Sequence, residues 1–95
     1  MRIVHELKIT PSNFNMVVGG DMSFQIRKND RDFREGEMIF LKEFKKGEFT
    51  GRAKPCRINL LLTNFEGLQE GYVLINIELV SLHITKEGVR YETKV

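Results

Sequence analysis

Short apolar patterns with a period of two recur along this chain, and they constrain its fold more than any other feature. Between residues 3 and 9, Ile3, Leu7 and Ile9 lie on one side of an extended chain, and His5 shares that side. This alternation predicts a β-strand with one buried face. We also predict strands at 23–28, where apolar and polar residues alternate, at 38–44 and 72–80, and at 57–62, which is rich in aliphatic residues. Residues 82–85 and 89–93 are predicted to form a terminal hairpin.

One short helix is predicted directly after the first strand. Thr10 offers a side-chain oxygen as a helix cap, Pro11 suits the first helical position, and Phe14 and Val17 follow at helical spacing before Gly19. We therefore predict a mainly β (α+β) fold, a pseudo-β-barrel of five to six strands with the helix plugging one end.

The composition limits the classes of protein that fit. Ninety-five residues suffice for one hydrophobic core, so we expect a single domain spanning 1–95. No apolar run approaches the roughly 20 residues of a membrane helix, and the charged first residues do not fit a secretory signal. Cys56 is the only cysteine, which excludes an internal disulfide and suits the cytoplasm. Because His5 and His83 are the only histidines, we predict no metal site and no cofactor.

Basic residues concentrate in the middle of the chain, although the net charge is only +2. Residues 27–57 contain ten Lys or Arg and six Asp or Glu, whereas acidic residues outnumber basic ones elsewhere. The net charge alone is too small to imply nucleic-acid binding, but the basic middle segment motivates the hypothesis of an anionic partner.

Residues 20–27 resemble a motif of the ASCH domain, a branch of the PUA-like superfamily. That motif, GxKxxExR, follows the first helix, and Gly20 and Arg27 match its two ends. Four further segments are similar to a family of short bacterial and phage proteins of unknown function within that superfamily: His5–Ile9, Gln25–Phe33, Thr50–Arg52 and Gly71–Val73. The resemblance covers residues 5–79 and is most specific at 26–33, so residues after Leu79 form an extension or hairpin outside it.

This resemblance implies a PUA-like barrel with a cleft between the helix, the Arg27 strand and the adjacent loop. Such domains are associated with RNA, and some small ASCH proteins are amidohydrolases that deacetylate a modified cytidine. Those enzymes use a lysine at the third motif position and a Thr or carboxylate partner at the sixth, where this chain has Met22 and Gln25. Neither side chain acts as a base or nucleophile, so we predict no catalytic residues.

Arg27 is the central predicted binding residue. It lies on the polar side of a strand and points either into solvent or into the end of the barrel. A guanidinium binds phosphate through two hydrogen bonds, but an ion pair with Glu6 or Asp30 explains an arginine here equally well.

The loop after Arg27 supplies further candidates. Lys28 and Arg31 are predicted to contact phosphate, and Asn29 to contact a base edge. By composition alone this loop also fits a solvated turn, whose aspartates bond its own backbone.

Three other residues complete the predicted site. Lys8, Arg52 and the Tyr72 hydroxyl are placed at the cleft, although Thr50–Arg52 fits a solvated glycine turn equally well. By contrast, Phe33 is expected in the core.

Three hypotheses follow, from different classes of protein. The first is a non-catalytic RNA- or nucleotide-binding module with a basic cleft. The second is an amidohydrolase acting on a modified nucleoside such as N4-acylcytidine, with Lys8 or Lys28 in place of the missing lysine. The third is a protein-interaction or phage accessory domain that forms a homodimer through the terminal hairpin.

Overall fold

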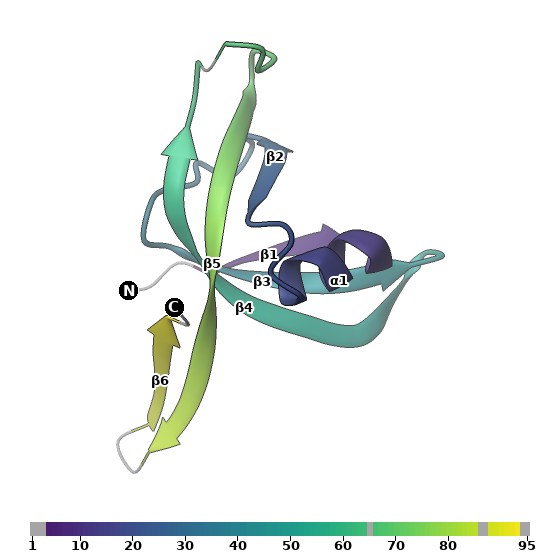
Figure 1. Ribbon diagram of the computed structural model, residues 1–95, viewed down its shortest axis with the longest axis vertical. Helices are drawn as coiled ribbons and strands as arrows, with labels where there is room; N and C mark the ends of the chain where they lie inside the picture. Colours follow the sequence, from purple (N-terminus) through teal and green to yellow (C-terminus); the bar gives the residue numbers. More distant parts are fainter. Residues whose placement is uncertain (1–3, 65, 86–87, 94–95) are drawn as a thin grey trace.

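A computed structural model describes residues 4–64, 66–85 and 88–93, with side chains described as far as Ser81 (Figure 1). One helix and six strands follow one another along this part of the chain: β1 (Val4–Ile9), α1 (Pro11–Val18), β2 (Phe24–Lys28), β3 (Met38–Lys45), β4 (Glu48–Leu62), β5 (Tyr72–Thr85) and β6 (Gly88–Thr93).

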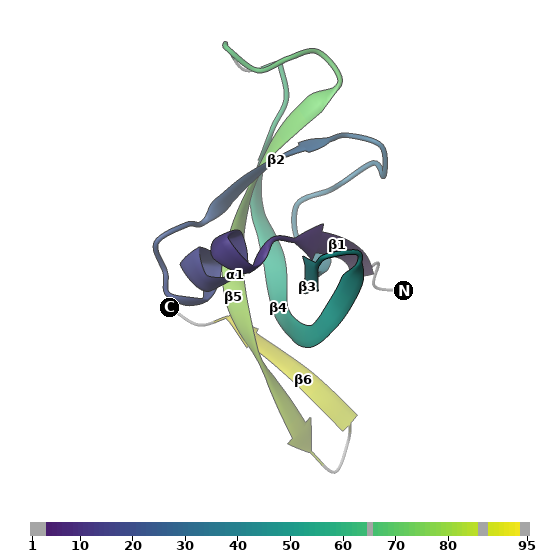
Figure 2. The same cartoon turned by 90° about the vertical axis from the view of Figure 1, so that its right-hand side faces the viewer.

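The strands form one curled sheet with the order β1-β3-β4-β5-β2. Only the β1–β3 pair is parallel among the described strands; the others are antiparallel. The sheet curls so that its two edge strands, β1 and β2, approach each other without pairing (Figure 2). We call this unpaired junction between β1 and β2 the seam, and α1 lies beside it. The predicted α+β pseudo-barrel is therefore confirmed as a half-barrel that backbone pairing leaves open.

The terminal hairpin is also present. β6 pairs with the far end of β5 between Val80 and Thr85, and this hairpin projects away from the curled sheet (Figure 1). The prediction of separate strands at 72–80 and 82–85 was wrong, because β5 continues through both segments without a break. A long strand can serve two partners in succession, which explains how one element joins the half-barrel to the hairpin.

Helix α1 begins and ends as the sequence predicts. Thr10 lies at the N-cap, where its Oγ1 accepts a hydrogen bond from the Asn13 backbone N–H at 3.3 Å. Phe14 and Val17 are buried on one face, and the helix ends at Gly19. The apolar face of α1 thereby joins the core that lines the inside of the sheet.

The core consists of the inward side chains of the sheet and α1. Phe33, in the loop between β2 and β3, is only 3% exposed, so its predicted core position is confirmed. His5 is also buried and packs edge-on against the Phe33 ring, with 4.7 Å between ring centroids. The loop that follows β2 is thus anchored to β1 at this point.

Strand β2 faces the opposite way from an ordinary amphipathic strand. Phe24 and Ile26 are 53% and 56% exposed, whereas Gln25 is buried and Arg27 is half-buried. Of the two orientations that the sequence allowed, Arg27 therefore adopts the inward one. The polar side chains of β2 point toward the seam, where hydrogen-bond donors are needed.

The segment Thr50–Arg52 is a bulge inside β4 and not a turn, although its three residues are exposed, as the solvated alternative expected. Phe44 pairs with Phe49 and Lys42 pairs with Ala53, so three residues of β4 lie opposite the single residue Glu43. Gly51 has a φ of +95°, which glycine adopts at little cost. The predicted β4 strand at 57–62 is correspondingly too short.

Within the described part of the chain, no helix is long and apolar enough to cross a membrane.

Candidate functional site

Arg27 spans the seam between the two edge strands. Its Nη2 donates to the backbone carbonyl of Lys8 at 2.9 Å and to the Gln25 side-chain oxygen at 3.0 Å. Among the described residues no carboxylate lies within 4.0 Å of this guanidinium, so the anticipated ion pair with Glu6 or Asp30 does not form. Burial, followed by repulsion from Arg31, lowers the pKa of Arg27. The site therefore holds a partly desolvated cation that no described carboxylate pairs with.

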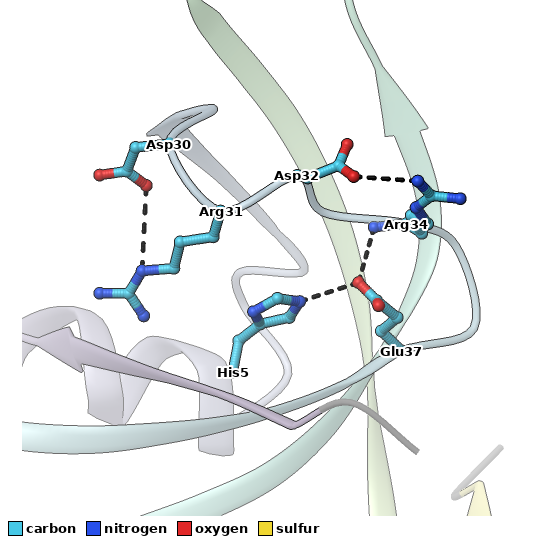
Figure 3. Close-up of polar contacts among 6 residues, drawn as sticks. All are labelled: His5, Asp30, Arg31, Asp32, Arg34 and Glu37. Carbon is cyan, nitrogen blue, oxygen red and sulfur yellow. Dashed lines mark hydrogen bonds and ion pairs between the residues drawn. The ribbon is translucent and has the colours of Figure 1, made fainter. Parts of the chain in front are cut away.

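Arg31 makes the second connection across the seam. Its Nη1 donates to the backbone carbonyl of Glu6, and its Nε lies 3.9 Å from an Asp30 carboxylate oxygen (Figure 3). Because β1 pairs only with β3 among the described strands, alternate residues of β1 direct their carbonyls away from the sheet. Arg27 and Arg31 donate to two such carbonyls. Their side chains thus make the hydrogen bonds that a neighbouring strand would otherwise make to β1.

A second polar network holds the loop between β2 and β3. His5 Nε2 lies 2.8 Å from Glu37 Oε1, and the same oxygen accepts a hydrogen bond from the Arg34 backbone N–H at 2.8 Å (Figure 3). The guanidinium of Arg34 pairs with Asp32 at 2.9 Å on the exposed side of the loop. These contacts hold the loop that carries Arg31 against β1.

A pocket of about 400 Å³ opens beside the arginines. Leu7, Phe49 and the carboxylate of Glu6 form part of its lining. The rest of the lining consists of four cationic side chains, those of Lys8, Arg27, Arg31 and Lys42. The Lys42 ammonium lies 3.8 Å from Glu6, which offsets part of the positive charge. A concave surface with this excess of cations attracts anions and is large enough for a small ligand.

Aromatic rings form one wall of this region. Phe49 packs edge-on against Phe44 with 5.0 Å between ring centroids. The Lys42 ammonium lies 4.4 Å from the centre of the Phe49 ring, and the Lys8 ammonium lies 4.4 Å from that of Phe44. Cation–π attraction therefore holds two of the lysines at the pocket.

A smaller pocket of about 180 Å³ lies on the loop side of the arginines. It shares Leu7, Arg27 and Arg31 with the larger one and adds Lys28, Asp30 and Phe33. Of the seven predicted site residues, Lys8, Arg27, Lys28 and Arg31 thus lie around one seam.

The other three predicted residues lie elsewhere. Asn29 and Tyr72 line a separate pocket of about 180 Å³ near the start of β5, where the Asn29 backbone N–H donates to Gly71. Arg52 lines none of these three pockets. Its side chain is directed instead to the buried Glu43 carboxylate, 3.7 Å from Nε, and to the Asn15 side-chain oxygen, which accepts from Nη2. Its position is that of a structural ion pair.

Sequence reasoning missed Lys42 and Phe49. The alternation in β3 places Lys42 on the outward face, but only the register of the β3–β4 hairpin brings Phe49 beside it. No group of three potential metal ligands among His, Cys, Asp and Glu occurs in the described part of the chain.

Fold and site together define a class of small α+β proteins in which one curled sheet is bridged by arginines and carries a basic pocket at its seam. The chain belongs to the family described as "Domain of unknown function (DUF3850)", whose model matches residues 4–77. It is also 34% identical, over 76 residues, to a phage protein, the "Uncharacterized 12.9 kDa protein in GpA 3'region" of Escherichia phage P2. That match covers 80% of this chain and 69% of the phage protein. The family match ends before the terminal hairpin and includes every residue that lines the seam pockets.

Proposed function

We propose that this protein is a non-catalytic RNA- or nucleotide-binding module of the ASCH branch of the PUA-like superfamily, which binds phosphate at the seam pocket. The observation that carries the proposal is the unpaired, half-buried guanidinium of Arg27, which lines this pocket with three other cations. A desolvated cation without a carboxylate partner gains more from an incoming anion than an exposed one does.

The geometry of Arg27 also suits phosphate. Its Nη2 is occupied by Lys8 and Gln25, whereas Nη1 and Nε have no partner among the described residues. These atoms provide the donors that a phosphate oxygen requires, and the two existing bonds hold the guanidinium in place. Arg31 and the two lysines add charge at short range, which fits a partner that carries more than one phosphate.

The test is the affinity of the protein for short single-stranded RNA at several salt concentrations. Arg27→Gln keeps a polar side chain near Lys8 but removes the charge, and we expect it to weaken binding about 10- to 100-fold. The plot of affinity against salt should also become less steep, because one fewer counter-ion is released. Arg57→Gln is the matched control, since it makes the same substitution at an ion pair with Glu78 outside the pocket. Equal effects of the two variants, or no binding by the unmodified protein, would contradict the proposal.

The non-catalytic part is tested separately. Incubation with N4-acetylcytidine, followed by chromatography, should release no cytidine above the rate in buffer, because Met22 and Gln25 supply neither base nor nucleophile. Turnover that Lys8→Ala abolishes would instead support the amidohydrolase alternative.

A further inference from the structure

We propose that Phe49 is a stacking platform for a nucleobase, so that the pocket accepts an unpaired nucleotide with its base on Phe49 and its phosphate at Arg27 and Arg31. This inference rests on the proposed function and specifies the class of ligand. The shared chemistry is an unpaired base with its phosphate, either in a free nucleotide or in single-stranded RNA.

The first argument is the position of the ring. Phe49 lies at the start of β4 and is 49% exposed, although it lines the pocket that contains Arg27. This exposure leaves ring surface available to a ligand inside the pocket. Its edge contact with Phe44 orients the ring, so a ligand would find a fixed aromatic surface.

The second argument is the charge around the ring. The Lys42 ammonium lies over the Phe49 ring, 4.4 Å from its centre, and the Lys8 ammonium lies over the same ring at 5.8 Å, so a base would stack on the part of the ring that these cations leave open. Stacking platforms for unpaired bases combine an aromatic ring with cations along the phosphate path. The pocket brings both components together from β1, β2, β3 and β4.

The third argument excludes other ligands by their chemistry. Inorganic phosphate would leave Phe49 exposed, and an uncharged apolar ligand would cover cations without neutralising them. A paired base has both faces stacked in its duplex, and a pocket of about 400 Å³ cannot admit a duplex. A planar ring joined to a phosphate, as in an unpaired nucleotide, matches both the aromatic and the cationic parts of the lining.

The test compares ligands of equal charge with and without bases. Binding of a short single-stranded RNA is measured against an abasic ribose-phosphate oligomer of the same length, and binding of CMP against ribose 5-phosphate, by calorimetry or NMR titration. We expect the base-containing ligand of each pair to bind roughly 5- to 150-fold more tightly. If the preference for the base-containing ligand is larger in the oligomer pair than in the mononucleotide pair, the ligand is single-stranded RNA. If the preference is the same in both pairs, the ligand is a free nucleotide.

Variants of Phe49 assign that preference to the ring. Phe49→Leu should reduce binding of the base-containing ligands to the level of the abasic ones, whereas Phe49→Tyr should preserve the preference. Phe24→Leu is the matched control, because Phe24 is similarly exposed but lies outside the pocket. Equal binding of ligands with and without bases would overturn this inference and leave the phosphate site standing. Failure of all four ligands to bind would overturn the proposed function as well.

Discussion

Glu37 shows how a single residue links the core to the candidate site. One of its carboxylate oxygens binds both the buried His5 ring and the Arg34 backbone N–H, so its contacts reach β1 and the loop that carries Arg31. The burial of His5 makes this carboxylate hard to replace, because a buried polar group without a partner is costly.

We expect Glu37→Ala to lower the free energy of unfolding by about 1–3 kcal/mol, since it leaves the His5 ring and the Arg34 amide without their acceptor. Urea denaturation followed by circular dichroism measures this change. Glu48→Ala, at an exposed position beside the β3–β4 turn, should alter stability by less than about 0.5 kcal/mol. A loss for Glu37→Ala no greater than that for Glu48→Ala would show that the network contributes little.

Among the elements, the edge strands β1 and β2 depend on side chains for their connection. Gln25 and Arg27 occupy the inner face of β2, and Arg27 and Arg31 donate to carbonyls of β1. This arrangement explains why the apolar residues of β2 face outward. The inner positions next to the seam are taken by donors that the β1 edge needs.

The double variant Arg27→Gln/Arg31→Gln should loosen the seam without unfolding the sheet. Amide hydrogen exchange is expected to accelerate in β1 and β2, while amides of β4 and β5 stay protected, because the central strands retain backbone partners on both sides. Arg57→Gln, which breaks an ion pair with Glu78 away from the seam, serves as the control. Unchanged exchange in β1 would mean that these arginines do not hold the edges together.

The bulge in β4 provides a second test at the scale of an element. Gly51→Ala should destabilise the protein by about 1–2 kcal/mol, because a β-carbon disfavours a φ of +95°. The space around a β-carbon there is open, so the cost arises from the backbone alone. Gly51→Asn should lose less, since asparagine tolerates positive φ better than alanine, and thermal melts of the three proteins compare them directly. An alanine variant as stable as the parent would contradict this account of the bulge.

Considered as a whole, the molecule follows the sequence wherever the signal is local. Thr10, Pro11 and Phe14 specify α1 within a few residues, and the period of two identifies the inward residues of β1. By contrast, the contact between Lys42 and Phe49 depends on hairpin register, and the pairing of Arg52 with Glu43 depends on a bulge. A single residue of register shift changes such contacts, so the strand that carries Arg27 was predictable and the opposite wall of the pocket was not.

The division of β5 between two sets of partners leads to a prediction about the entire chain. The residues that line the seam pockets end at Phe49, whereas β6 pairs with β5 from Val80 onward and with no other described strand. A protein truncated after Ser81 should therefore keep its curled sheet and bind single-stranded RNA with the affinity of the full chain. Fluorescence anisotropy measures the affinity, and light scattering gives the mass of both proteins in solution. A fall in mass from dimer to monomer would assign the hairpin to self-association, whereas loss of RNA binding by a folded truncated protein would place part of the site beyond Ser81.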